Sequence, residues 1–220
     1  MTVVTFPEID EHGRGLDRTI GFSDGVFAIA ITLLVLNFRV PQVSGHSIDA
    51  HLLDALTDGS GTLTGFVVSF YVIARFWIAH HRLTILLRNV DSVFIALNLV
   101  FLGAIVFLPF PTEVVGRYGQ STTAVVFYAS AMTITGVLSA AVWQYALRHG
   151  LIDERMTLQA KRQALARSVM TPLVFATSVP IAFLDPGGAK YWWILLVGQR
   201  WVSRRFGGTD GPSTRRAHRR

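Results

Sequence analysis

Long apolar runs alternate with short polar segments along most of the 220 residues. Two of these runs, residues 92–112 and 118–147, contain no Asp, Glu, Lys or Arg. An uncharged apolar run of about 18 or more residues is typical of a helix that crosses a lipid bilayer. A chain of this length is too short to bury several such runs in a soluble core. The pattern therefore predicts an all-α, polytopic membrane protein.

The same pattern predicts six transmembrane helices in a single module, residues 1–206. The expected spans are 21–38, 61–80, 93–109, 122–147, 168–184 and 191–206. Pro109 and Pro111 are expected to end the third span, because proline cannot continue a regular helix. In the sixth segment only 191–198 is strongly apolar, so the span must extend into the polar residues that follow.

Basic residues fall in alternate connections between these spans. The first, third and fifth connections each hold one, namely Arg39, Arg117 and Lys190. The N-terminal segment, the second connection, the fourth connection and the C-terminal segment hold two or more each. Because Lys and Arg accumulate on the cytoplasmic side of membrane proteins, both termini are expected to face the cytoplasm of a multi-pass cell-membrane protein.

Residues 207–220 are rich in Gly, Ser and Arg, which predicts a disordered, basic cytoplasmic tail. The tail has two possible roles: it fixes the topology, or its charge contacts anionic membrane lipid. The net charge of +6 also raises nucleic acid as a partner. The basic residues are placed where membrane topology requires them, so no nucleic-acid partner is expected.

Enzyme and metal motifs are missing from the sequence. There is no phosphate-binding loop, nucleophile elbow or zinc-protease motif, and no cysteine. His80 and His81 are adjacent, which places them about 100° apart on a helix, whereas helical metal ligands favour a spacing of four residues. We expect no catalytic activity, no metal site and no cofactor.

Asp24 is the one carboxylate inside the first predicted span. A charged side chain in a span is costly and is commonly paired or functional. Asp24 is therefore expected to find a partner on another helix, with Arg75, His80 and His81 of the second span at a similar depth. The alternative is a helix N-terminal residue that the helix dipole stabilises.

Thr32 is the single polar side chain between Val26 and Leu36. At about 100° per residue it shares a face with Ile29, Leu33 and Leu36, and Asp24 falls roughly opposite. The alternative role for its hydroxyl is a hydrogen bond to a carbonyl of its own helix. Hydropathy does not distinguish the faces, because the whole segment is apolar.

The string Arg18-Thr-Ile-Gly-Phe22-Ser23-Asp24 at the start of the first span resembles the signature of the transmembrane protein 175 family. Members are six-span cation channels in bacteria and two-repeat channels in animal lysosomes. Residues 76–82, Phe-Trp-Ile-Ala-His-His-Arg, and the stretches Leu97-Asn98 and Leu108–Thr112 are similar to bacterial members.

The resemblance implies a leak-type, potassium-permeable channel built from four identical subunits, with potassium as the permeant ion. It implies that the first span lines the pore, with a hydrophobic constriction at Ile29 and further layers at Thr32 or Leu33 and then Leu36. A second set of residues would hold the first helix against the second: Arg18, Phe22, Ser23, Asp24, Trp77 and His80.

Two other functions stay open. Pro172 and Pro180 could interrupt the fifth span as in a secondary transporter. No carboxylate lies near the middle of a span to couple ion movement, which favours the channel. The second alternative is a membrane scaffold that transports nothing.

Overall fold

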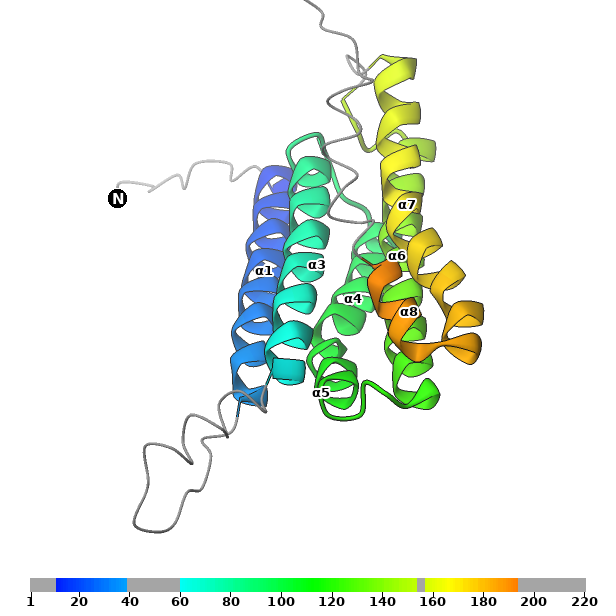
Figure 1. The fold of residues 1–220 in the computed structure, drawn as a ribbon. Helices are drawn as coiled ribbons and strands as arrows, with labels where there is room; N and C mark the ends of the chain where they lie inside the picture. Colours follow the sequence, from blue (N-terminus) through cyan, green and yellow to red (C-terminus); the bar gives the residue numbers. More distant parts are fainter. Residues whose placement is uncertain (1–10, 39–59, 154–156, 194–220) are drawn as a thin grey trace, which may run out of the picture.

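The computed structural model describes residues 11–38, 60–153 and 157–193, and its regular structure is helical apart from one isolated β-bridge (Figure 1). The elements in chain order are α1 (Glu11–Leu33), the 3-10 turn η1 (Leu34–Asn37), α3 (Ser60–Thr84), α4 (Ser92–Phe107), α5 (Pro109–Arg117), α6 (Thr122–Arg148), α7 (Leu158–Leu184) and α8 (Pro186–Trp192).

Four segments of the described chain are long and apolar enough to cross a membrane: Gly15–Leu36, Thr62–Thr84, Ser92–Arg117 and Thr122–Arg148. They correspond to the first four predicted spans. The apolar part of α7, Ser168–Leu184, corresponds to the fifth and is shorter than these. Most of the sixth predicted span lies outside the described residues, as does the predicted tail 207–220.

The prediction that the third span ends at Pro109 is wrong. Pro109 instead begins α5, and the candidate span runs on to Arg117. Proline is well tolerated at the start of a helix, where its missing N–H would have no helical acceptor. The Thr112 N–H donates to the Leu108 carbonyl at 3.1 Å, so helical hydrogen bonding resumes within one turn.

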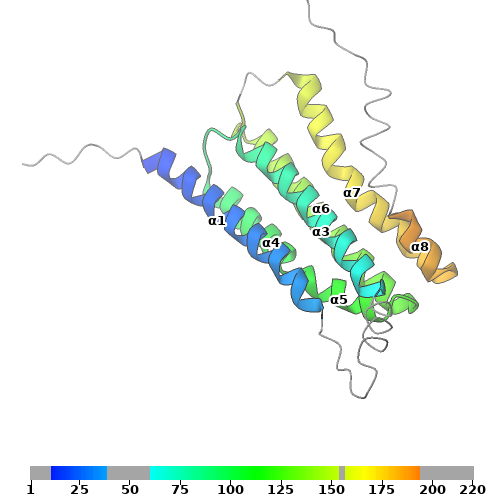
Figure 2. The same ribbon diagram turned by 60° about the vertical axis from the view of Figure 1, so that its left-hand side comes forward.

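The long helices run alternately up and down, and successive helices lie side by side (Figure 1). α1 and α3 form one pair, α4 and α5 lie next to them, and α7 and α8 pack against α6 on the far side. Figure 2 shows the same order from another direction. We call the end where α1 begins and α3 and α6 finish the basic end, because Arg82, Arg88 and Arg148 lie there.

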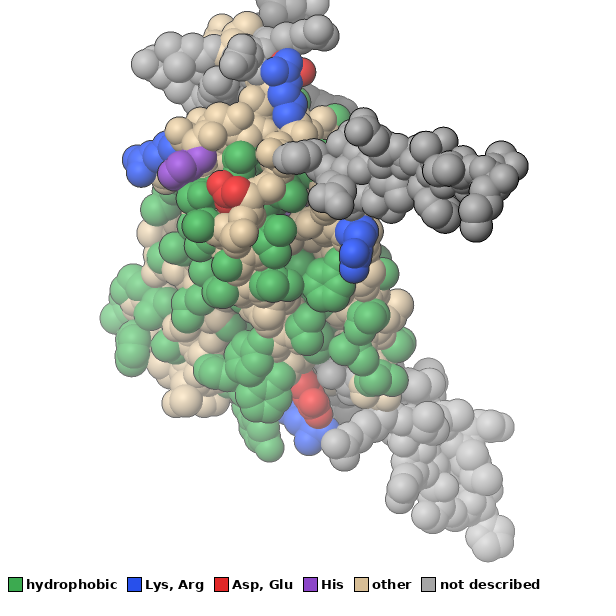
Figure 3. Space-filling model, turned by 180° about the vertical axis from the view of Figure 1, so that it is seen from behind, with side chains coloured by type: hydrophobic (Ala, Val, Ile, Leu, Met, Phe, Trp, Pro, Cys, Tyr) green, Lys and Arg blue, Asp and Glu red, His purple; other side chains and the backbone are tan. Residues whose placement is uncertain are grey.

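Hydrophobic side chains cover the middle of the molecular surface in Figure 3, and charged side chains gather toward its two ends. This distribution suits a bilayer core between two polar interfaces.

A buried chain of hydroxyl groups ties the helices together beyond Pro109. The Thr112 hydroxyl of α5 donates to Ser69 Oγ of α3 at 2.8 Å, and Ser69 Oγ lies 3.0 Å from the Tyr128 hydroxyl of α6. In a bilayer such groups have no water to bond, so hydrogen bonds across helices stabilise the packing.

α6 and α7 form the closest helix pair of the described chain. A Cβ atom added to Gly136 of α6 would lie 2.7 Å from Pro172 Cδ of α7. Both Pro172 and Pro180 lie inside α7, which remains one helix from Leu158 to Leu184. The prolines therefore pack against a neighbour without dividing the helix.

Candidate functional site

One face of α1 is completely buried within the subunit. Its members recur every three or four residues, and each is at most 1% exposed: Ser23, Phe27, Ala30 and Leu34. That spacing places them on a single helical face. This face meets α3 and α4, so α1 is held on one side only by the described chain.

The opposite face of α1 is uncovered. Ile29 is 57% exposed and Leu36 is 70% exposed, and Thr32 is exposed between them. Gly25 lies on the same side, where an added Cβ would meet nothing within 4 Å. Leu33 is half-buried, so it lies at the edge of this face. We call Gly25, Ile29, Thr32 and Leu36 the open face of α1.

The hydroxyl of Thr32 donates a hydrogen bond to the Ile29 carbonyl at 2.9 Å. This is the local hydrogen bond that the sequence left open as an alternative. It uses the hydroxyl proton and leaves the oxygen lone pairs on the exposed side, where they can accept a hydrogen bond or contact a cation.

Asp24 finds its partner on α3. The Trp77 Nε1–H donates to Asp24 Oδ1 at 3.0 Å. The indole ring of Trp77 also stacks on the imidazole of His81, with 5.3 Å between ring centroids and 18° between planes. Asp24, Trp77 and His81 therefore form one contact line between α1 and α3.

Ser23 bonds to α4, through a residue absent from the predicted site. Asn98 Nδ2 donates to Ser23 Oγ at 2.9 Å, and the Ser23 hydroxyl donates to the Thr19 carbonyl at 2.7 Å. The sequence carried a signal for Asn98, because it is the only amide side chain in the uncharged run 92–112.

His80 is buried among aromatic rings. Its imidazole lies 5.7 Å from the rings of both Phe27 and Phe101, measured between centroids. His80 Nε2 and Asn98 Oδ1 are buried without a hydrogen-bond partner among the described residues. His80 thus joins the packing of α1, α3 and α4, whereas its neighbour His81 is exposed.

Two residues of the predicted structural set make no contact of the expected kind. Arg18 is exposed and has no hydrogen bond or ion pair with another described residue. Phe22 is 56% exposed. Both lie near the basic end on the uncovered side of α1, so their contribution to helix packing stays a prediction.

The site contains no arrangement for metal binding or covalent catalysis. Within residues 11–38, 60–153 and 157–193, no three His, Asp or Glu side chains come together in a way that could hold a metal ion. An uncovered apolar helix face with one hydroxyl suits contact with another surface or with a passing solute.

A family model described as endosomal/lysosomal potassium channel TMEM175 matches residues 18–109. The match begins at Arg18 and extends through α1, α3 and α4, the helices that carry the contacts described above.

Two curated relatives extend the similarity beyond these helices. A protein named as a potassium channel from Streptomyces collinus is 34% identical over 173 residues, which cover 76% of this chain and 82% of the relative. Another, from Chamaesiphon minutus, is 36% identical over 149 residues, which cover 66% of this chain and 70% of the relative.

The fold is also similar to a solved structure. The crystal structure of a lysosomal potassium-selective channel TMEM175 homologue from Chamaesiphon minutus matches with a TM-score of 0.71 and 27% identity. The alignment covers 87% of this chain and 98% of that one.

Proposed function

Because the chain belongs to the TMEM175 family, we propose that it is a potassium-permeable, leak-type channel whose pore is lined by α1 from four identical subunits. The family is one of ion channels and not of enzymes. The observation that carries the pore assignment is the open face of α1, which the rest of the described chain leaves uncovered.

A single subunit has one such helix and cannot enclose a pore with it. Closed rotational symmetry supplies the missing copies, and each copy then presents the same face to the axis. The proposed partners are three further copies of this chain, the surrounding membrane lipid and potassium ions. The open face would then meet the axis, and the buried face Ser23–Leu34 would hold α1 to its own subunit.

The constriction is assigned to Ile29. Four isoleucine side chains around an axis form a narrow, poorly hydrated neck, and such necks gate by losing water. A cation crossing the neck must shed part of its hydration shell, which costs less for potassium than for sodium. The Thr32 oxygens, one turn further along, would replace part of that water, and Leu36 would form the outer apolar ring.

The orientation follows from the charges. The basic end carries Arg82, Arg88 and Arg148, whereas the opposite end has the Arg117–Glu113 pair, with 2.9 Å between Nη2 and Oε1. The basic end would face the cytoplasm of a cell-membrane protein, which places both termini there.

Nothing in the described helices favours a carrier. A transporter commonly needs a span that unwinds at the substrate site. α7 is the candidate with two internal prolines, yet it stays helical and packs against Gly136.

Ile29→Asn tests the pore assignment. A polar ring stays wet for both ions, so conductance should rise by about threefold or more, and potassium preference over sodium should fall toward unity. The measurement is the single-channel conductance and the reversal potential of purified protein in lipid bilayers under opposed potassium and sodium solutions.

Ala131→Asn is the matched control, because Ala131 is a buried α6 residue that the proposal places away from the pore. Its surviving channels should keep the wild-type reversal potential. If intact Ile29→Asn tetramers keep both the conductance and the reversal potential of the wild type, α1 does not line the pore.

A further inference from the structure

Two loops at the basic end are tied to one another. The loop after α3 and the loop after α6 meet in an isolated antiparallel bridge between Leu87 and Ile152. The Arg88 N–H donates to the Leu151 carbonyl at 2.9 Å. The Arg88 guanidinium also pairs with Asp153, with Nη2 and Oδ1 2.8 Å apart. We call this pair of loops the basic-end clamp.

Asp91 adds a second tie beside the bridge. Its Oδ1 accepts the Phe94 N–H at 2.7 Å and so caps the start of α4. Its Oδ2 accepts the Tyr145 hydroxyl of α6 at 2.9 Å. One carboxylate therefore holds the start of α4 and the last turn of α6 together.

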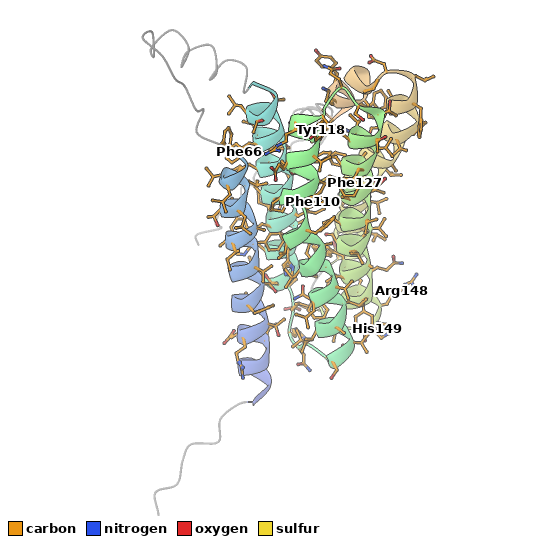
Figure 4. The ribbon with its side chains drawn as sticks, turned by 90° about the horizontal axis from the view of Figure 1, so that it is seen from below. Phe66, Phe110, Tyr118, Phe127, Arg148 and His149 are labelled. Atoms are coloured by element: carbon orange, nitrogen blue, oxygen red, sulfur yellow. The ribbon has the colours of Figure 1, made fainter. Side chains whose placement is uncertain are left out.

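His149 completes this tie at the end of α6. Its ring stacks on Tyr145, with centroids 4.0 Å apart and 20° between planes. His149 Nδ1 lies 3.0 Å from the Tyr145 carbonyl oxygen. A carbonyl only accepts hydrogen bonds, so Nδ1 carries the hydrogen and Nε2 is the atom that can gain a proton. Figure 4 shows Arg148 and His149 together at this end, away from Phe110 and Tyr118.

We propose that His149, Tyr145 and Asp91 form a proton-binding site, and that a proton bound at His149 tightens the basic-end clamp. The ligand is a proton from the solution that bathes the basic end. The site lies outside the pore proposed above and uses none of its residues.

Three features favour a positive charge on His149. The face of Tyr145 attracts a cation that stacks on it. The last carbonyls of α6 present the negative end of the helix dipole. Asp91 supplies a carboxylate on the other side of the Tyr145 hydroxyl. Histidine is the side chain whose ordinary pKa puts this charge change between about pH 5 and 8.

Asp91 stays ionised over that range. The Phe94 N–H is the main reason that the pKa of the Asp91 carboxyl is held below its ordinary value, and the Tyr145 hydroxyl and the charge of His149 lower it further. Among the described residues, the other charged groups of the clamp are Arg148, which opposes the proton, and the paired Arg88 and Asp153.

The sign of the pH dependence follows. The attraction between protonated His149 and Asp91 stabilises the folded clamp when His149 is charged. It is therefore present at mildly acidic pH and disappears as the pH rises through the titration of the imidazole. Because the Asp91 pKa is lowered, the attraction should persist well below pH 6.

Thermal unfolding of the purified full-length protein between pH 8 and pH 6 tests the site. The melting temperature of the wild type should rise relative to that of His149→Gln by roughly 1–4 °C as the pH falls. Asp91→Asn keeps an N-cap, because asparagine caps helices well, but it removes the charge. In the Asp91→Asn background, His149→Gln should lose at least half of its pH-dependent effect.

Arg148→Gln is the matched control, since it changes a neighbouring charge and keeps the titrating ring. Its pH profile should remain parallel to that of the wild type. A melting difference between wild type and His149→Gln that is the same at pH 8 and pH 6 would overturn the site.

The consequence for conduction rests on the proposed channel function. α1 contacts α3 and α4, whose connecting loop the clamp holds, so a tighter clamp changes the frame around the pore helix. In excised patches, changing the pH at the basic end from 8 to 6 should alter the potassium current at least twofold, and His149→Gln should remove the response. An equal response in His149→Gln would overturn this coupling. Melting shifts as expected without any current would support the proton site and refute the channel.

Discussion

α1 and α6 are both long apolar helices, yet the subunit treats them differently. Within the apolar window of Gly15–Leu36 22% of the residues are buried, and within that of Thr122–Arg148 50% are. α6 is surrounded by α4, α5 and α7, and its small residue Gly136 lets α7 approach closely. α1 meets neighbours on one face and leaves Ile29, Thr32 and Leu36 uncovered.

The difference separates a scaffold helix from a helix that another surface must complete. An apolar face toward lipid needs no hydroxyl and no glycine, but the open face of α1 has Thr32 and Gly25 beside its large residues. In membranes, small and hydroxyl-bearing residues are enriched where helices meet other helices. This composition is one more reason to direct the open face toward further copies of the chain.

The largest effect is expected where the scaffold helix is tightest. Gly136→Val would force side-chain atoms into Pro172, whose Cδ lies only 2.7 Å from an ideal Cβ. Neither backbone can yield cheaply, so we expect a loss of about 3 kcal/mol or more of unfolding free energy and little folded protein. Fluorescence-detected size-exclusion chromatography and a melting curve in detergent would measure this.

Gly103→Val of α4 is the matched control, because an added Cβ there meets nothing within 4 Å. It should retain a wild-type melting temperature within the subunit. Equal melting temperatures for Gly136→Val and Gly103→Val would show that the α6–α7 contact is not tight.

An intermediate effect is expected at the contact between α1 and α3. Trp77→Phe removes the indole donor to Asp24 while retaining an aromatic ring, which should lower the unfolding free energy by about 1 kcal/mol. Asp24→Asn removes the charge and keeps an acceptor oxygen, so tetramer yield should fall before ion selectivity changes. Assembly by size exclusion and the reversal potential, measured on the same samples, separate the two effects.

A sharp change of selectivity in intact Asp24→Asn tetramers would contradict this assignment. It would move Asp24 from helix packing to the ion path, and the division between the two faces of α1 would then be wrong.

Much of the fold is legible in the sequence, because a bilayer demands long uncharged helices. The first four predicted spans correspond to helices of the structure. The error at Pro109 has a local cause: the sequence pattern does not distinguish a proline that ends a helix from one that begins the next. The sixth span 191–206 depends on residues outside those that the structure describes.

The site was partly predictable for a different reason. A lone carboxylate in a span must find a partner, which indicated an interhelical contact for Asp24. The buried face of α1 could not be deduced, because Phe27 and Ile29 are equally apolar and only tertiary packing distinguishes them. Asn98 was missed because one amide in an apolar run has no helical period to reveal its direction.

The smallest effect is expected at Thr32, and it sharpens the account of the open face. The Thr32 hydroxyl proton is used by the Ile29 carbonyl at 2.9 Å, so the oxygen can present lone pairs to a cation. Thr32→Ala removes that oxygen and little volume, so the neck at Ile29 keeps its width. We expect the potassium-to-sodium permeability ratio to fall about twofold to fivefold, a cost of roughly 0.4–1 kcal/mol, with conductance nearly unchanged. Thr32→Ser keeps the hydroxyl and should retain the wild-type ratio, as measured by reversal potentials under opposed potassium and sodium solutions. If Thr32→Ser and Thr32→Ala lower the ratio equally, the methyl group and not the oxygen matters, and the neck alone selects the ion.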